Sequence, residues 1–396
     1  MNPFESVRPH LEFTCKQETF PAPSAEADVV FKYARWLQKN NQLRQKDTVH
    51  VEVERLYRVA SENGHVKANI NLQNGALRED FKLRGVEHIR MSQQLMDAGV
   101  AYGYYLVGIF LHQGAAGLHK DEAMGLRYLR KAADEGDPQA QFEVGQKLEP
   151  SQAAPEVALQ MYQCAANQGH GKAAISLGIH LKNNARYNAA LEVFQLGVAA
   201  GNENAAGRLE EAFQAPAPEA DLYYLAQHHD PERVERYEKI WRILANYSYA
   251  NPTVPEINDI VPLPPAKLPD WSGKLQWLEA HLANVPPEKP SEALIAQLAQ
   301  AKGLDPATGK PLPGSPALSQ ADLHPRRSYT GELCPTSGYW TNIELFRERA
   351  VDGPIALYIK EGDVMPPLLM RHYKRRHWPW SDKITEYIEP VEWKLI

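Results

Sequence analysis

Cysteine is scarce in this chain of 396 residues: there are three, Cys15, Cys164 and Cys334, and they lie far apart. They form no Cys-x-x-Cys pair and no cysteine and histidine cluster at metal-ligand spacing, so neither a zinc site nor a disulfide framework is indicated. One pair could form a disulfide, but the spacing does not say which pair it is.

Long apolar runs and an excess of basic charge are also absent. No run of about 18 apolar residues occurs, and the first six residues lack the basic and apolar regions of a secretory leader. The sequence as it stands is therefore expected in the cytoplasm, or in the periplasm if a leader has been removed. A net charge of -6 gives no electrostatic reason to bind nucleic acid or anionic lipid. We expect no nucleic-acid partner and no membrane span.

What is abundant is proline, and it is unevenly placed. The length of 396 residues allows two or three domains, and the 43% apolar content is enough for ordinary cores. Of the 30 prolines, 7 lie in residues 1–215, 17 in residues 216–325 and 6 beyond. This distribution predicts segments of different character along the chain.

The strongest pattern is a repeat in residues 55–210. Glycines that end an alanine-rich helical pattern recur at nearly regular intervals: Gly64, Gly99, Gly136, Gly169 and Gly201. A small residue stands four positions after each, and a second glycine stands nine positions after three of them, at Gly108, Gly145 and Gly178. The first glycine suits a helix end in the left-handed conformation, and the small residues allow close helix packing. The pattern predicts stacked helix pairs.

One repeat unit is especially distinctive. It contains Tyr104-Tyr105-Leu106-Val107-Gly108 and then Tyr128-Leu129-Arg130-Lys131-Ala132-Ala133-Asp134-Glu135-Gly136. It closely resembles the Sel1-like repeat, a relative of the tetratricopeptide repeat. The resemblance implies an α-solenoid that binds protein on a concave surface and is not an enzyme. Residues 26–45 are expected to form a helix that caps the first repeat.

The helices that follow each glycine line the inner surface of such solenoids. Their apolar members belong to the core, so only outward-pointing residues could contact a partner. We expect these to be Asn69, Asn71, Tyr104, Gln141, Glu143, Ser176 and His180.

The proline-rich middle, residues 216–325, keeps helical periodicity only in pieces. Its prolines predict extended connectors, either an ordered strap packed along the solenoid or a polyproline ligand for another protein. Trp271 and Trp277 favour the strap, because they are too apolar for a free linker. Ser291 has the features of a helix start.

The C-terminal segment, residues 326–396, has strand-like runs and four of the eight tryptophans. Two motifs stand out, Gly331-x-x-Cys334-Pro335-x-Ser337-Gly338-x-Trp340 and Gly362-x-x-Met365-Pro366. Together they resemble a C-terminal module of bacterial immunity proteins that neutralise toxins delivered by type VI secretion. The resemblance implies a small β-rich module without catalytic residues, and such proteins often carry a lipoprotein leader, which is absent here.

Other candidate sites have plainer interpretations. Cys334 could be a nucleophile if His372 or His377 lay close, but a structural cysteine in a tight aromatic turn is favoured. Adjacent His228 and His229 point apart on a helix and make a poor metal site. The basic run from Arg371 to Trp378 could bind phosphate groups or an acidic partner surface, although a solvated face is favoured. Its candidate contacts are Arg371, Arg375 and Trp378.

These observations predict a mainly α protein with four segments: an N-terminal segment (1–25), a Sel1-like solenoid (26–215), a proline-rich strap (216–325) and a small aromatic C-terminal module (326–396). We expect an immunity protein, without cofactor, metal or small-molecule substrate, that occludes the active-site face of a secreted effector such as a type VI phospholipase. The alternative is an intracellular scaffold or adaptor for a signalling or regulatory partner, and an enzyme using Cys334 is a remote third possibility.

Overall fold

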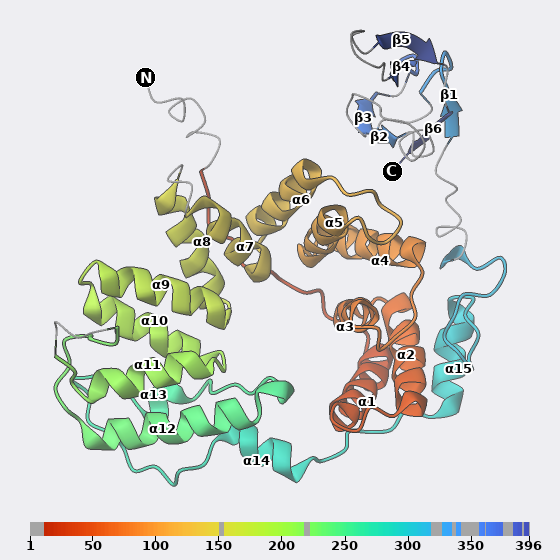
Figure 1. Ribbon diagram of the computed structural model, residues 1–396. Coiled ribbons are helices and arrows are strands. Elements are labelled where there is room, and N and C mark those ends of the chain that lie inside the picture. Colours follow the sequence, from red (N-terminus) through yellow and green to blue (C-terminus); the bar gives the residue numbers. More distant parts are fainter. Residues whose placement is uncertain are drawn as a thin grey trace.

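The computed structural model shows an array of antiparallel helix pairs that curves around an open centre (Figure 1). The structure describes residues 12–149, 154–217, 222–317, 327–334, 338–341, 356–360, 362–374, 383–389 and 392–395. The predicted α-solenoid is confirmed. Its helices are α1 (Ala25–Asn41), α2 (Asp47–Glu62), α3 (Val66–Leu77), α4 (Gly85–Asp97), α5 (Tyr102–Gln113), α6 (Glu122–Glu135), α7 (Pro138–Leu148), α8 (Pro155–Asn167), α9 (Gly171–Asn183), α10 (Tyr187–Ala199) and α11 (Glu203–Phe213).

Each repeat turns at its first glycine. All five glycines have a positive φ, between 73° and 113°, which a residue with a Cβ adopts only with strain. In four of the five turns the next residue, His65, Asp137, His170 or Asn202, accepts a hydrogen bond from a backbone N–H of the following helix. The helix end and the next helix start are therefore encoded by two adjacent residues.

The second glycines are contact points between successive repeats. A Cβ added to Gly145 would lie 2.6 Å from the Tyr162 ring, one added to Gly108 would lie 3.0 Å from Leu129, and one added to Gly178 would overlap the Phe194 ring. Leu129, Tyr162 and Phe194 each stand seven positions before the glycine that ends their own helix. The missing side chain of one repeat thus makes room for a large side chain of the next.

The proline-rich segment packs along the helices. It contains α12 (Pro231–Asn246), the 3₁₀ turn η3 (Ser248–Ala250), α13 (Ile257–Ile260), α14 (Gln276–Ala283) and α15 (Glu292–Ala301). Val254 N donates to Ala199 O at 3.0 Å, and Val254, Ile257 and Val261 belong to the same core cluster as α9–α11. Ser291 caps α15 as predicted, accepting from Leu294 N at 3.1 Å.

The end of this segment returns to the first helices. Trp36 Nε1 of α1 donates to Asn284 Oδ1 at 3.0 Å, and Asn284 also exchanges two hydrogen bonds with Asn40. Beyond them α15 lies beside α2, where Ile295 and Ala299 share a core with Leu56 and Ala60 (Figure 1). The curved array is therefore closed by contacts between its two ends.

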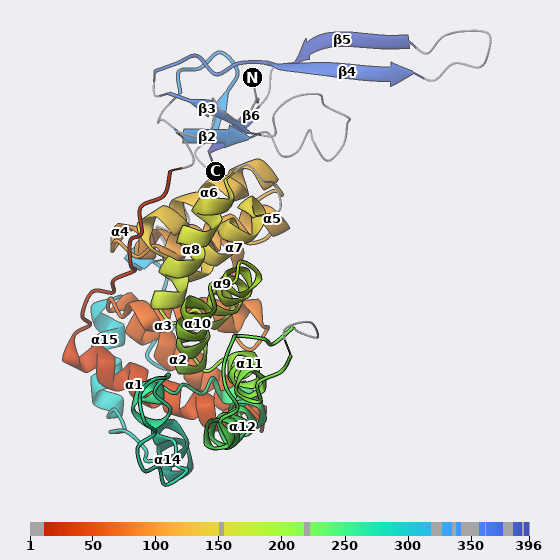
Figure 2. The same cartoon turned by 90° about the vertical axis from the view of Figure 1, so that its left-hand side faces the viewer.

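An N-terminal arm, residues 12–24, runs along one side of the array to α1 (Figure 2). A disulfide joins Cys15 of the arm to Cys164 of α8, with a Cα–Cα distance of 5.6 Å. Arg130 donates to the arm carbonyl of Glu12, and Gln141 donates to that of Lys16. The arm is thus attached to α6, α7 and α8.

Beyond Pro325, the part of the chain that the structure describes forms strands. They are β1 (Arg327–Tyr329), β2 (Gly338–Thr341), β3 (Ala356–Ile359), β4 (Leu368–Lys374), β5 (Lys383–Glu389) and β6 (Glu392–Leu395). An antiparallel sheet has the order β1-β6-β2-β3, and β4 pairs with β5. Within the described ranges, no helix has the length and apolar character that crossing a membrane requires.

The two C-terminal motifs lie against each other. Cys334 N donates to Asp363 O at 2.7 Å, Gly362 N donates to Cys334 O at 2.9 Å, and Met365 N donates to Glu332 O at 2.8 Å. Cys334, Trp340, Met365 and Trp393 form a buried cluster. Although the motifs are well separated in sequence, their loops therefore form one unit.

The close contact at Gly145 generates a stability prediction. Gly145→Ala should destabilise the protein by about 1–3 kcal/mol, because the new methyl group overlaps the buried Tyr162 ring. Gly207→Ala in α11 is the matched control: its Cβ would lie 3.4 Å from Trp241, an ordinary contact, so alanine should stabilise the helix by up to about 1 kcal/mol. Chemical denaturation measures both. Equal effects of the two substitutions would contradict the packing argument.

Candidate functional site on the face of the post-glycine helices

Hydrogen-bonded polar side chains recur across α1, α2 and four of the helices that follow the glycines, α3, α5, α7 and α9. At one end Arg35 Nη1 donates to Gln38 Oε1 at 2.6 Å, and Tyr57 OH donates to the same oxygen at 2.9 Å. Asn71 Nδ2 of α3 donates to Tyr57 OH at 3.3 Å. We call this set of residues and its continuation below the polar ladder.

The ladder continues from α3 through α5 and α7 to α9. Tyr102 OH donates to Asn74 Oδ1 at 3.0 Å, and the Tyr102 and Tyr105 ring centroids are 5.2 Å apart. Tyr105 OH and Gln139 Nε2 both donate to Glu143 Oε1, at 2.9 Å each. The imidazole of His170 is 2.8 Å from Gln139 Oε1. The side chains that present this face are thus fixed by one another before any partner binds.

The neutral form of His170 is part of this arrangement. Its Nδ1 accepts from Ala173 N at 3.1 Å, so Nε2 carries the proton that is donated to Gln139. Burial, together with the charge of Lys172, lowers the pKa of His170 to about 4. The ring therefore stays neutral at physiological pH and keeps both hydrogen bonds.

A polar cavity of about 620 Å³ lies at the α1 end of the ladder. Its walls come from α1, α2 and α3, from the turn after α3, and from Tyr249 and Asn251 of the returning segment. Gln42 Nε2 donates to Tyr249 O, so the wall from the returning segment is tied to α1. The lining side chains include Arg35, Gln38, Gln42, His50, Asn71, Asn74, Arg78 and Asp80.

Two residues expected to point outward do not. Asn69 is 3% exposed and its amide donates to Met91 O at 3.0 Å, while Gln141 is fully buried and donates to Ala133 O and to Lys16 O. Both stand five positions after their glycine, which places them about 200° around the helix from the exposed position at seven. We therefore correct this expectation and leave both out of the candidate surface.

The other expected residues have varied positions. Asn71 and Glu143 belong to the ladder, and Ser176 has the equivalent place on α9, seven positions after its glycine. Tyr104 is half-buried beside Tyr128, and His180 lies near Asn184 at the end of α9. Arg371 is in β4 with its backbone opposite Glu386, whereas Arg375 and Trp378 lie outside the described residues.

Sequence reasoning missed most of the ladder. Tyr102 and Gln139 stand three positions after their glycines, Tyr105 stands six and Asn74 ten. Positions 3, 6, 7 and 10 after the glycine fall on one side of a helix, so polar residues with this spacing could have predicted the ladder. Arg35 lies outside the repeats and had no such signal.

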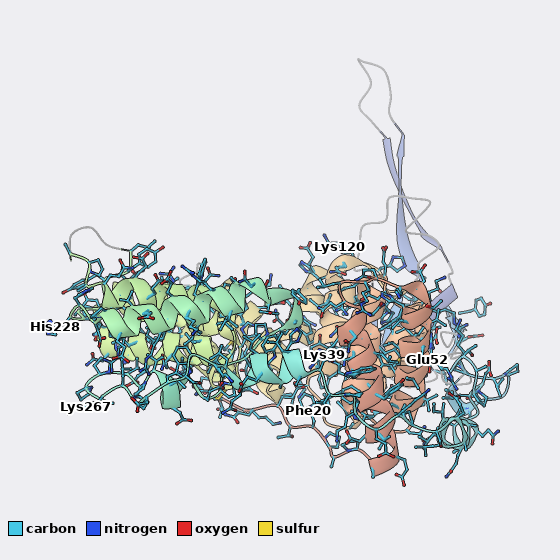
Figure 3. All side chains as sticks on the ribbon, turned by 90° about the horizontal axis from the view of Figure 1, so that it is seen from below. Phe20, Lys39, Glu52, Lys120, His228 and Lys267 are labelled. Atoms are coloured by element: carbon cyan, nitrogen blue, oxygen red, sulfur yellow. A yellow bond between two sulfur atoms is a disulfide. The ribbon has the colours of Figure 1, made fainter. Side chains whose placement is uncertain are left out.

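The other candidate residues are Cys334, proposed as a nucleophile, and the histidines proposed as a base or as metal ligands. Cys334 is buried, and its thiol contacts Ile359 O at 3.8 Å. The side chain of His372 and the whole of His377 lie outside the description, so their approach to Cys334 stays a prediction. His228 and His229 are exposed residues ahead of α12, and His228 lies at the edge of the molecule in Figure 3.

A buried carboxyl group, Asp137, and a half-buried one, Glu18, lie where the N-terminal arm meets α7. Burial and the charge of Glu18 in the arm raise the pKa of Asp137 to about 8, against a hydrogen bond from Ala140 N. Burial also raises the pKa of Glu18, whose carboxylate accepts from Tyr102 N at 2.8 Å. Packing of the arm against α7 therefore withdraws two carboxyl groups from solvent, which destabilises their charged forms.

Comparison with known proteins gives a partial match. A domain of unknown function, DUF6396, matches residues 205–312, which begin inside α11 and run past α15. No curated protein shows significant similarity to the chain.

Solved structures similar to the chain include the immunity protein Pa5087 from Pseudomonas aeruginosa, at 25% identity and a TM-score of 0.49 over 64% of this chain and 95% of that one. The P. aeruginosa immunity protein PA5088 gives 26% identity and a TM-score of 0.49 over 64% and 94%. A Sel1 repeat protein from Oxalobacter formigenes gives 17% identity and a TM-score of 0.41 over 55% and 87%.

The raised pKa of Asp137 generates a pH prediction. The folded carboxyl holds its proton up to about pH 8, whereas the unfolded one releases it near 3.8, so the stability from this group is present below about pH 4 and is lost progressively as pH rises from 4 to 8. Asp137→Asn keeps the helix cap, since Asn202 has that role in α11. The variant should melt at least about 3 °C above the parent at pH 9 and within about 1 °C of it at pH 4.

Asp230→Asn at the start of α12 is the matched control. Burial raises the pKa of Asp230, but hydrogen bonds from Arg233 outweigh burial and lower it overall. Its carboxylate is therefore charged in both states above pH 5, and any change in melting temperature should be the same at pH 6 and pH 9. A pH-independent difference for Asp137→Asn, measured by differential scanning calorimetry, would contradict the prediction.

Proposed function

We propose that this protein is an immunity protein that binds a secreted antibacterial effector through the polar ladder face and blocks its action. The observation that carries the proposal is the ladder itself, which crosses α1 to α9 with side chains held by hydrogen bonds within the chain. A surface that is ordered before binding loses less conformational entropy when a partner docks. This is what a tight and specific protein inhibitor requires.

The C-terminal motifs support the same role. In sequence they resemble the module of type VI immunity proteins, and their loops are joined by backbone hydrogen bonds around Cys334. We take the effector to be a phospholipase or another lipase, by analogy with Sel1-like immunity proteins. The ladder face would cover the entrance to its active site, so the inhibition would act by occlusion.

The disulfide between Cys15 and Cys164 favours an oxidising compartment, because structural disulfides are rare in the reducing cytosol. We therefore propose that the protein works in the periplasm, where a lipid-degrading effector would meet its substrate. An intracellular adaptor, the alternative from the sequence, fits a disulfide-bonded chain less well.

Co-expression tests the proposal. A lipase-like effector encoded beside this protein is directed to the periplasm with and without the protein, and growth and complex formation by size-exclusion chromatography are measured. We expect protection and a stable complex. Unchanged killing together with the absence of a complex would overturn the proposed function.

Charge reversal on the ladder face locates the contact. Lys67 and Lys172 are both exposed in the first turns of α3 and α9, three positions after a glycine, where glutamate also suits the helix. Lys67→Glu with Lys172→Glu should weaken the complex at least tenfold without lowering the melting temperature. Arg127→Glu, exposed on α6, is the control and should leave affinity unchanged. Equal affinities for all three proteins would place the contact elsewhere.

Thiol counting tests the compartment. Protein purified from its native host is denatured, alkylated without reductant and weighed by mass spectrometry. We expect one alkylated cysteine, Cys334, and three after reduction. Three alkylated cysteines before reduction would contradict the periplasmic assignment, and cytosolic expression in a reducing strain serves as the reference.

A further inference from the structure

We propose that the polar cavity bounded by α1, α3 and Tyr249 binds a carboxylate carried by an extended segment of the partner protein. The inference rests on the proposed function, because the partner is the effector, and it assigns the α1 end of the ladder face a specific pocket and a ligand chemistry. The carboxylate would be an aspartate or glutamate side chain or a chain end, held by Arg35 and neighbouring amide donors.

The first argument is the direction of the amides. Gln38 uses its Oε1 to accept from both Arg35 and Tyr57, and Asn74 uses its Oδ1 to accept from Tyr102. Within the described residues neither amide nitrogen makes a hydrogen bond, so the NH₂ groups of Gln38 and Asn74 are left as donors. Two amides that use their acceptors internally favour a ligand that accepts hydrogen bonds.

The second argument is the charge. Arg35 lines the cavity and forms no ion pair with any carboxylate in the described part of the chain; its hydrogen-bond partners there are the neutral side chains of Gln38 and Tyr57. Arg78 is paired with Asp80, which His50 also approaches at 3.9 Å. The cavity lining thus contains two guanidinium groups but one carboxylate, that of Asp80, and a ligand carboxylate would supply a negative charge for Arg35.

A third observation concerns the surroundings of Arg35. Lys39, one turn further along α1, lies beside Trp277 and His281 of α14, in a hollow next to this cavity. Figure 3 labels Lys39. Burial lowers the pKa of Lys39 and the charge of Arg35 lowers it further. Positive charges that repel one another at this end of α1 would both be stabilised by an incoming anion.

The size and walls of the cavity favour a peptide over a small anion. Its volume of about 620 Å³ exceeds what a single carboxylate needs, and its wall carries further amides at Gln42, Gln45 and Asn71. Side-chain amides provide both donors and acceptors, which suits the backbone of an extended peptide. The Arg35 guanidinium would set where the acidic group is held.

Direct binding of a short peptide tests the site. The full, disulfide-intact chain is titrated with the blocked tripeptide acetyl-Ala-Glu-Ala-amide, and binding is followed by saturation-transfer NMR. We expect saturable binding in the millimolar range. The matched peptide acetyl-Ala-Gln-Ala-amide should bind at least tenfold more weakly. No saturable binding of the glutamate peptide, or equal binding of both, would overturn the proposal.

Paired variants locate the binding. The double variant Arg35→Gln with Arg78→Gln should bind the glutamate peptide at least tenfold more weakly than the parent. Arg127→Gln with Arg186→Gln removes the same charge from exposed positions outside the cavity and should leave binding unchanged. Because Arg35→Gln could disturb α1, Arg35→Lys is measured as well: it keeps the charge but not the guanidinium geometry, and should bind with intermediate affinity. Equal affinities in all variants would overturn the assignment.

The effector complex separates this proposal from the function it rests on. If the effector is bound and neutralised equally by the parent and by Arg35→Gln with Arg78→Gln, the cavity is not part of the interface and the proposal fails while the immunity function stands. If the glutamate peptide binds as expected but no effector is neutralised, the carboxylate site stands and the proposed function fails. Inorganic phosphate that displaces the peptide at equal affinity would replace the peptide assignment with a general anion site.

Discussion

The contact between a glycine of one repeat and a large side chain of the next governs the rest of the helical array. At Gly108, Gly145 and Gly178 the missing side chain lets Leu129, Tyr162 and Phe194 approach the helix backbone. Helix spacing in such arrays follows from the side chains at the crossing point. The ladder depends on this spacing, because hydrogen bonds such as Tyr105 to Glu143 join neighbouring repeats and need a fixed separation.

In the first repeat, polar groups take the place of this contact between a glycine and a large side chain. Gln73 stands where later repeats have glycine, and Ser92 stands where they have the large side chain; Ser92 Oγ donates to Gln73 Oε1 at 3.2 Å. His88 also contacts that oxygen, at 3.1 Å, and Gln73 donates to Asn69 Oδ1 at 2.8 Å. The groups of a buried polar network find all their hydrogen-bond partners in only one packing arrangement. This network therefore fixes how the helices of the first repeat pack, at the end of the array where α15 also packs.

Much of the helical region could be predicted from sequence, and the reasons are local. The glycine turns, the α1 cap helix and the Ser291 cap each depend on residues within a few positions of one another. The predicted face of Asn69 and Gln141 was wrong, because small residues at four and nine obscured which positions point outward. The disulfide partner of Cys15 and the contact of Asn40 with Asn284 join residues 149 and 244 positions apart, and no local pattern encodes such pairs.

The return of the proline-rich segment to α1 and α2 has a consequence for how the array loses structure. A linear stack of repeats frays from its ends, because terminal units have one neighbour instead of two. Here the hydrogen bonds of Asn284 and the packing of α15 give the first helices a second neighbour, and the Cys15–Cys164 crosslink fastens the arm that leads into them. The first repeat is therefore not a free end from which unfolding can begin. Amide hydrogens of α1 and α2 should exchange with solvent as slowly as those of helices at the centre of the array.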